Sequence, residues 1–464
     1  MFNIAIMPTN RAAADIFDAI VIGGGPAGSI AALALARRGR RAIVLEKDQF
    51  PRFHIGESFL PATFDRLREL GLEPALRELP HVPKFGAEFA MGNGGTHLEI
   101  EFADGFCPGA ETFNIERSVF DAMLLREAGR GGAEVRQGVT VKQILSLADG
   151  NVRLQTDAGE IRGRYLLDAS GQGTVVGRHL GTRKTADEPH LRKVAYFNQF
   201  QNVWRPSGLK QGHPLIAMMD EGWFWMIPLN ERVTSVGMVL DAEVARRIGQ
   251  DEKIASDQML AWGIARCPAV HERMREAVGA KMNRVAADFS YSCRPYAGEG
   301  YFLVGDSATF MDPIFSTGVS VAVNGAMAVA KYVDDILAGR ISASRARKRY
   351  TSHLEESTGT LFQIIRQYYE HSFRELFLNG TGPLEVHRAV IGVLAGNVFP
   401  RPPWKLRWRL RFFDFLVKWN RKRQLVPRRR RFSLLKSNPA PREQPGEGPS
   451  ESPTAAVAET HAGS

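Results

Sequence analysis

Three glycines near the start of the chain have the spacing of a phosphate-binding turn: Gly23, Gly25 and Gly28, with Ala27 inside the motif. The first glycine permits a tight turn, the second lets the backbone approach a pyrophosphate, and the third lets a helix pack closely on a strand. Glu46 follows 23 residues after Gly23, close to the spacing at which a carboxylate accepts hydrogen bonds from ribose hydroxyls. The pattern predicts a dinucleotide site, and a chance glycine-rich turn is the alternative.

The neighbouring residues predict the elements that this motif needs. Residues 19–22 are apolar and mostly β-branched, which is typical of a buried strand. A helix is expected from Ser29 to about Arg38, followed by a second strand over residues 41–45. Strand, glycine turn, helix and strand together predict a βαβ unit.

A second carboxylate distinguishes between NAD and FAD, which both fit the glycine motif. Asp306 follows a short apolar segment, residues 301–304, and Arg117 lies within residues 114–121. Together with residues 168–171 they resemble flavoproteins of the glutathione-reductase type. The resemblance implies that Asp306 holds the ribityl chain of FAD and that Arg117 contacts the flavin. Because no second Gly-x-Gly-x-x-Gly motif occurs, reducing equivalents are expected from a separate flavin reductase.

Four further segments carry a more specific resemblance. They are residues 222–228 (Gly-Trp-Phe-Trp-Met-Ile-Pro), 50–58 (Phe-Pro-Arg-Phe-His-Ile-Gly-Glu-Ser), 84–89 (Lys-Phe-Gly-Ala-Glu-Phe) and 310–319 (Phe-Met-Asp-Pro-Ile-Phe-Ser-Thr-Gly-Val). The first is similar to the Trp-x-Trp-x-Ile-Pro motif of flavin-dependent halogenases. The others resemble that family's His-Ile-Gly-Glu-Ser stretch, its lysine segment and its flavin and halide loop. The resemblance implies an enzyme that uses reduced FAD (FADH2), oxygen and chloride or bromide.

The resemblance also implies roles for particular residues. In the family, hypohalous acid made at the flavin travels inside the protein to a lysine, which presents the halogen to an electron-rich ring. Lys84 is therefore the expected catalytic residue, and arginine could not replace it because a guanidinium stays protonated. The implied wall of the substrate channel comprises Trp223, Trp225, Phe89 and Phe315, the halide site comprises Thr317 and Gly318, and Pro313 contacts the cofactor.

Phe315 departs from the pattern of the tryptophan-acting members of that family. Those members have a glutamate immediately before the Ser-Thr-Gly sequence, where it is thought to support the lysine and the ring intermediate. A phenol or pyrrole is activated by its own heteroatom and needs less help from a carboxylate. The departure argues against free tryptophan and favours a phenol or pyrrole substrate.

Length and composition predict a globular protein of more than one domain. The chain has 464 residues, 44% apolar and 24% charged. We expect an α/β fold: a glutathione-reductase-type FAD-binding Rossmann-like domain, an inserted and mostly antiparallel β-sheet substrate domain, and a helical C-terminal region. The expected boundaries are residues 16–80, 115–185 and 285–335 for FAD binding, 81–114 and 190–284 for the substrate side, 336–436 for the helical region and 437–464 for a disordered tail.

Several other features limit the function classes. The three cysteines are too few and scattered for a disulfide framework or a zinc site, so no metal is expected. No apolar run reaches the roughly twenty residues of a membrane span, and the first fourteen residues lack a secretory signal pattern. These features predict a cytoplasmic protein.

One segment carries the chain's positive charge. Residues 401–431 contain thirteen Lys or Arg and one acidic residue, a net charge of +12, whereas the whole chain carries +10. Trp404, Trp408, Phe412, Phe415 and Trp419 recur there at helical spacing. The plainest interpretation is a helix packed on the catalytic core with a solvated basic face. Docking of an acidic acyl or peptidyl carrier protein that holds the aromatic substrate is the main alternative, membrane contact is less favoured, and nothing indicates nucleic acid binding.

Two rival functions remain at this stage. One is another oxidoreductase of the same fold, either an FAD-dependent aromatic monooxygenase or a geranylgeranyl-reductase-like enzyme. The other is a flavin-binding protein without catalysis. Lys84 and the Trp223–Trp225 pair argue against both, and a halide requirement would decide between the first rival and a halogenase.

Overall fold

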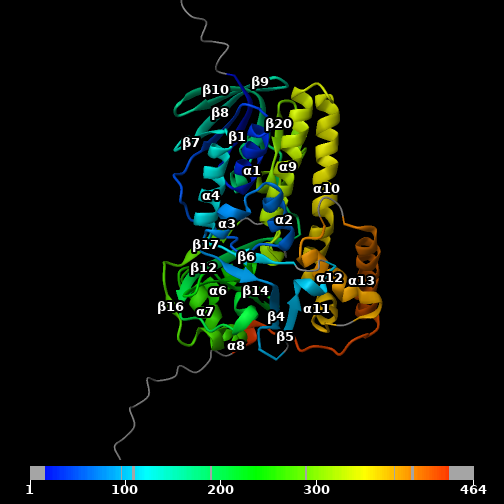
Figure 1. The fold of residues 1–464 in the computed structure, drawn as a ribbon. Coiled ribbons are helices and arrows are strands. Elements are labelled where there is room, and N and C mark those ends of the chain that lie inside the picture. The colour runs from blue at the N-terminus through cyan, green and yellow to red at the C-terminus, as the bar shows by residue number, and fades with distance from the viewer. Residues whose placement is uncertain are drawn as a thin grey trace, which may run out of the picture.

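The computed structural model describes residues 16–95, 97–106, 110–188, 191–287, 290–380, 382–398 and 402–437. Residues 1–15 and the expected disordered tail, apart from Ser437, lie outside these residues, as does Cys107. Figure 1 shows one large sheet with its helices in the upper part of the molecule, a second sheet in the lower part, and a group of C-terminal helices beside the second sheet. The two sheets and these helices agree with the predicted α/β fold class.

The first sheet has the strand order β19-β20-β10-β1-β2-β7, with β8 and β9 attached through β10. Its strands are β1 (Ile16–Ile22), β2 (Ala42–Glu46), β7 (Glu134–Gln137), β8 (Val141–Ala148), β9 (Asn151–Thr156), β10 (Gly159–Asp168), β19 (Ala297–Gly298) and β20 (Tyr301–Leu303). Strand β1 pairs in parallel with β10 and β2, and β10 pairs in parallel with β20. The carboxyl ends of these strands therefore meet at one edge, where ligands bind in doubly wound sheets.

Helices cover this sheet and bring later segments of the chain to the same edge. They are α1 (Pro26–Ala36), α2 (Pro61–Glu69), α3 (Glu73–Arg77), α4 (Arg117–Arg130), α5 (Val175–His179), α9 (Gly318–Leu337) and α10 (Ala343–Tyr368). Helix α1 begins at Pro26, three residues before its expected start, because Gly25 takes the N-cap position and the fixed backbone angle of proline suits the first turn. Helix α1 packs against both α4 and α9, so ten of its eleven residues are buried.

The second sheet has the order β16-β12-β15-β14-β13-β4-β5, with β17 also paired to β12. Its strands are β4 (Gly86–Met91), β5 (His97–Glu101), β12 (Lys193–Gln201), β13 (Leu215–Met219), β14 (Gly222–Pro228), β15 (Val233–Asp241), β16 (Val278–Gly279) and β17 (Arg284–Ala287). All pairs are antiparallel except β13 with β4. Helices α6 (Ala242–Asp251), α7 (Met259–Arg266) and α8 (Pro268–His271) lie beside it. The four-part domain division drawn from the sequence stays a prediction.

Two smaller sheets connect these parts. One pairs β3 (Val82–Lys84) with β6 (Thr112–Asn114), and the other has the order β11-β18-β21. The strands of the latter are β11 (Arg183–Thr185), β18 (Tyr291–Cys293) and β21 (Thr309–Phe310). The first of these sheets carries Lys84 at the end of β3.

The C-terminal region contains α11 (His371–Leu378), α12 (Val386–Leu394) and α13 (Trp404–Lys422). Helix α13 packs on the protein mainly through residues outside its aromatic stripe, of which the half-buried Phe412 contacts the hydrophobic core. Its buried side is a different set: Leu406, Phe413, Leu416, Val417 and Asn420. Trp404, Phe415 and Trp419 face outward, with 65%, 53% and 42% of their surfaces exposed. None of the described helices is both long and apolar enough to cross a membrane.

Candidate active site

The glycine motif forms the turn between β1 and α1, where side chains would collide with the backbone. Gly23 has a φ of +98°, and a Cβ atom on it would lie 2.4 Å from the carbonyl oxygen of Ala169. A Cβ atom on Gly28 would lie 1.9 Å from the carbonyl oxygen of Gly23. Both contacts are closer than any packed carbon tolerates. The turn therefore requires glycine at the first and third motif positions, as expected for a strand and helix in close contact.

A cavity of about 560 Å³ opens at this edge of the first sheet. Most of the residues singled out in the sequence line it: Gly23, Gly25, Ala27, Glu46, Arg117, Trp223, Trp225, Asp306, Pro313, Thr317 and Gly318. Gly28 lies behind it, where α1 meets β1. We call this space the flavin-side cavity. Its lining brings together segments that lie far apart in the chain, as a bound dinucleotide requires.

The polar groups of this cavity fit FAD. At the ribose end, Oε2 of Glu46 accepts a hydrogen bond of 2.6 Å from Gly24 N, which fixes the carboxylate at the turn. Arg117 is buried and held by Asp121, with 2.7 Å between Nε and Oδ1, and its Nη1 donates to Ile55 O at 2.9 Å. Burial raises the pKa of Asp306 to about 6, and the nearby charge of Arg117 opposes that shift. The Asp306 carboxyl has no hydrogen-bond partner within the part of the chain that the structure describes, which leaves it available to the ribityl hydroxyls.

Glu57 belongs to the His-Ile-Gly-Glu-Ser stretch, and the sequence alone did not indicate a role for it. It lines the flavin-side cavity, and its Oε1 atom is buried with no hydrogen-bond partner among the described residues. Burial raises the pKa of Glu57 to about 7. A buried polar atom without a partner is costly, so this one supports a polar ligand in the cavity.

The loop before α9 is held in place by Asp312 and by Tyr369, of which the sequence alone did not reveal Tyr369. Oδ1 of Asp312 accepts from Ile314 N at 3.0 Å, and its Oδ2 accepts from the hydroxyl of Tyr369, at the end of α10, at 2.5 Å. Thr317 is the N-cap residue of α9, and Gly318 begins the helix. The first N–H groups of a helix have no partners within it and favour anions. Thr317 and Gly318, which line the cavity, are therefore in a suitable place for a halide.

Trp223 and Trp225 stand on the same face of β14, because side chains alternate along a strand. Their ring centroids are 5.8 Å apart, and Nε1 of Trp225 donates to Ser235 Oγ at 3.1 Å. Both side chains are buried and line the flavin-side cavity. The pair thus forms a fixed aromatic surface opposite the glycine turn.

Lys84 is buried, with 3% of its surface exposed. Its Nζ atom donates to Ser58 Oγ at 2.9 Å and to Phe59 O at 3.0 Å, and it lies 5.0 Å from the centroid of the Phe102 ring. Lys84 does not itself line the flavin-side cavity, but its partner Ser58 does. Burial lowers the pKa of Lys84 to about 7, from an ordinary value of 10.5. A large fraction of the amine is therefore neutral, and nucleophilic, at neutral pH.

Phe89 and Phe315 are also buried, but neither lines the flavin-side cavity. The Phe89 ring packs edge-on against Phe377 of α11, with centroids 4.8 Å apart. The Phe315 ring packs edge-on against Tyr368 at 5.6 Å. The structure thus separates these two phenylalanines from Trp223 and Trp225, although the sequence placed all four in one wall.

The lowered pKa of Lys84 predicts how activity depends on pH. The ammonium form is not nucleophilic, so the lysine-dependent rate should rise as pH increases through about 7 and level off above it. The measurement is single-turnover product formation at a series of pH values, with trapped hypohalous acid measured in parallel to separate oxidant supply from transfer. A transfer rate that falls over this range would contradict a neutral amine.

The fold and the flavin-side cavity define a flavoprotein. The profile of the FAD binding domain family matches residues 17–353. The 1H-pyrrole-2-carbonyl-(peptidyl-carrier protein) chlorinase of Pseudomonas fluorescens is 30% identical over 380 residues, which cover 76% of this chain and 83% of that protein. The flavin-dependent halogenase armH3 of Armillaria mellea is 32% identical and covers 76% of this chain and 74% of its own length.

A solved structure supports the same assignment. The flavin-dependent brominase Bmp2 is 27% identical and superposes with a TM-score of 0.77 over 88% of this chain and 100% of that one. The chain belongs to the flavin-dependent halogenases. It is an oxidoreductase that uses FAD and a halide, as the sequence motifs predicted.

Proposed function

We propose that this enzyme halogenates an electron-rich aromatic ring, a phenol or a pyrrole, by transferring halogen from hypohalous acid through Lys84. The observation that carries the proposal is the environment of Lys84: a buried amine, with its pKa lowered to about 7, one residue behind the wall of the flavin-side cavity. A surface lysine would be protonated and solvated, and it would have no access to an oxidant made inside the protein.

Bound reduced FAD would supply oxygen activation, which converts oxygen and halide to hypohalous acid. The chain's own residues then have three tasks. Thr317 and Gly318 hold the halide at the start of α9, and the Trp223–Trp225 pair keeps the aromatic substrate away from the flavin. Lys84 holds the halogen for transfer: the new carbon–halogen bond replaces a carbon–hydrogen bond, the oxygen–halogen bond breaks, and the ring proton leaves with the oxygen as water.

Phe315 supports the choice of substrate. Its ring packs edge-on against Tyr368, and it stands in place of the glutamate that is thought to stabilise the ring intermediate in the tryptophan-acting members. A phenol or pyrrole heteroatom supplies that stabilisation within the substrate. The similar chlorinase of Pseudomonas fluorescens is named for a pyrrole substrate, which agrees with this class.

Dependence on a separate flavin reductase is the first expected result of the proposal. The sequence contains one dinucleotide motif, which we assign to FAD, so reduced flavin has to come from another protein. Purified protein with FAD, NADH, oxygen and halide should give no halogenated product until a flavin reductase is added. Rapid oxidation of NADH by the protein alone would contradict this prediction and favour a monooxygenase.

Delivery of the substrate on an acidic carrier protein is supported by the outer face of α13. Its exposed aromatics, Trp404, Phe415 and Trp419, lie among exposed basic residues, among them Lys422 and Arg423. By contrast, the guanidinium of Arg428 bonds the buried Glu375 and that of Arg429 bonds Leu378 O, so both serve the protein's own packing. The relative named for a carrier-bound pyrrole makes this form of delivery chemically reasonable.

If a carrier docks there, turnover of a carrier-bound pyrrole thioester should fall on the order of tenfold in high salt. Replacing Lys422 and Arg423 together by glutamine should lower kcat/KM at low salt and flatten the salt dependence. The matched control replaces Lys348 and Arg349, two exposed basic neighbours on α10. Equal turnover of the free acid and the thioester, unaffected by salt, would remove the carrier from the proposal.

A further inference from the structure

Ser316, directly before the proposed halide site, has a backbone conformation that its side chain disfavours. Its φ is +56° and its ψ is +30°, in the left-handed region where glycine is the usual residue. A hydrogen bond of 2.9 Å from Ser316 N to Pro313 O closes the turn. Thr317 and Gly318 follow at the start of α9, so the turn sets the direction of their N–H groups. A strained conformation of this kind persists only where its surroundings hold it.

Asp312 fastens the other end of this turn. Its Oδ1 atom accepts from Ile314 N inside the turn, and its Oδ2 atom accepts from the hydroxyl of Tyr369. Asp312 is completely buried. Burial raises the pKa of this carboxyl, and the nearby charge of Lys193 opposes that shift. Because a buried carboxylate that loses a donor is costly, the bond from Tyr369 is needed to keep Asp312 in place.

Tyr369 is the C-cap residue of α10, and residues from two other parts of the fold hold it there. The ammonium group of Lys193 on β12 lies 3.9 Å from the centroid of the Tyr369 ring and pairs with Asp241 at 2.6 Å. The guanidinium of Arg374 on α11 lies 5.9 Å from the same centroid and donates to Met219 O of β13 at 2.9 Å. Cations over an aromatic ring fix its position. The second sheet therefore carries the hydroxyl that holds the halide loop.

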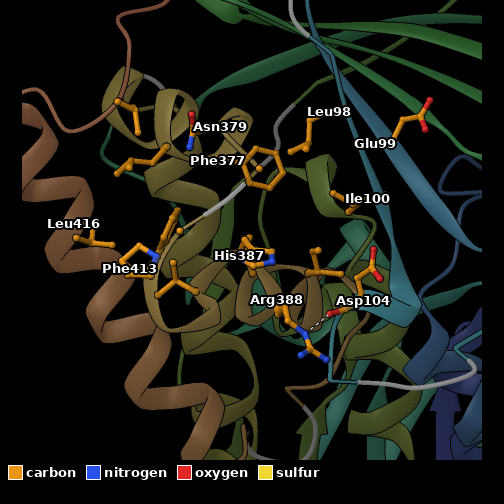
Figure 2. A pocket seen from close by; sticks show the side chains of 18 of the residues that line it. Leu98, Glu99, Ile100, Asp104, Phe377, Asn379, His387, Arg388, Phe413 and Leu416 are labelled. Atoms are coloured by element: carbon orange, nitrogen blue, oxygen red, sulfur yellow. Dashed lines mark hydrogen bonds between the residues drawn. The ribbon is translucent and has the colours of Figure 1, made fainter.

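Helix α11 is packed firmly enough to support this arrangement. The ring of Phe373 stacks on Phe377 and meets Phe413 of α13 edge-on, with centroids 5.9 and 5.4 Å apart. Phe377 and Phe413 line a cavity of about 720 Å³ between the edge of the second sheet and the C-terminal helices (Figure 2). Tyr369 and Arg374 do not line that cavity. The anchor of the halide loop is therefore packed protein rather than the wall of a binding space.

We infer that Tyr369 is a positioning residue of the halide site. Through Asp312 it holds Ser316 in its strained conformation and thereby directs the N–H groups of the two residues that follow. The inference rests on the halide placement in the proposed function. Without the hydroxyl, Asp312 loses a donor and the turn relaxes towards a negative φ at Ser316. The N–H groups at the start of α9 then change direction, and the affinity for chloride or bromide falls.

The test replaces Tyr369 by phenylalanine, which removes the hydroxyl and keeps the ring contacts. With reduced FAD and oxygen supplied and hypohalous acid trapped, the bromide KM should rise on the order of tenfold, as expected for a lost hydrogen bond to a buried carboxylate. The kcat at saturating bromide should stay nearly unchanged. The matched control is Tyr368→Phe, because the buried hydroxyl of Tyr368 has no hydrogen-bond partner within the described residues. Thermal denaturation and bound FAD check the folding of both variants.

A second variant separates positioning from packing. Glycine adopts a positive φ without strain, so a turn with glycine at position 316 no longer depends on its anchor. Ser316→Gly combined with Tyr369→Phe should therefore recover most of the halide affinity that Tyr369→Phe loses. A loss of affinity that glycine does not restore would assign Tyr369 a general packing role and overturn the inference.

Halide binding is also measured without turnover, from the broadening of the chloride NMR signal by FAD-loaded protein. An unchanged line width and bromide KM in Tyr369→Phe would overturn the inference alone. If the wild type does not broaden the signal, the halide placement fails and the inference fails with it. If halide affinity responds as expected but no halogenated ring forms, transfer through Lys84 fails and the role of Tyr369 stands.

Discussion

Lys84→Ala should lower halogenation by on the order of a thousandfold, the range expected when a positioned reactive group is lost, and should leave FAD binding unchanged. The reason is that halogen transfer and FAD binding take place at different positions in the protein. Lys84 does not line the flavin-side cavity, so its loss leaves the cofactor contacts intact. What disappears is the buried neutral amine that bonds Ser58 and faces Phe102. The measurement is single-turnover product formation by mass spectrometry, with bound FAD measured by its absorbance.

Two further variants separate the chemistry of the amine from its packing. Lys84→Met keeps the aliphatic stem and most of the volume, so the protein should fold normally and remain inactive. Lys84→Arg keeps the charge but introduces a guanidinium that stays protonated, and it should also be inactive. Hypohalous acid should still escape from all three variants and be trapped in solution. Product formation near the wild-type rate in Lys84→Met would show that another group transfers the halogen.

Gly28→Ala should abolish FAD binding and destabilise the protein. The added carbon would lie 1.9 Å from Gly23 O and 3.1 Å from a methyl group of Val21, so α1 must move away from β1. Overpacking of this kind costs about 1–3 kcal/mol of unfolding free energy. The same displacement moves the N-terminus of α1, which faces the cofactor, so we expect affinity for FAD to fall at least about a hundredfold, since it loses the helix contacts to the pyrophosphate.

The matched control for this prediction is Gly249→Ala. Gly249 lies in α6, and a Cβ atom there meets only Ile254 O at an ordinary 3.5 Å. Alanine also has a higher helix propensity than glycine, so the control should be neutral or slightly stabilising. Thermal denaturation and FAD titration of both variants check the prediction. If Gly28→Ala binds FAD like the control, the turn is looser than the structure indicates.

The parts of the fold that the sequence predicted well are those with local signals. The βαβ unit around residues 16–46 follows directly from apolar patterns and turn residues. Helix α13 was expected too, but its orientation was not. Two apolar stripes occur on it, and only tertiary packing decides that Phe413 and Leu416 face inward while Phe415 and Trp419 face outward.

The sequence predicted the site residues that belong to local motifs. It did not predict those that reach the site through contacts between distant segments. Residues at the glycine turn and after β20 meet because parallel strands end at one edge, which spacing can reveal. Phe102 and Tyr369 were not found, because nothing local indicates that one faces Lys84 and the other holds Asp312. The cavity between the edge of the second sheet and the C-terminal helices was also not found, since its walls come from residues 98–104 and from residues 376–426.

The most direct test of the account supplies purified protein with chemically reduced FAD, oxygen, chloride or bromide, and a panel of alkylphenols and pyrroles. The product should show the isotope doublet of chlorine or bromine in its mass spectrum. Its formation should require protein, halide and Lys84. A hydroxylated product formed without halide, or no product from any ring, would contradict the assignment of halogenation to this site.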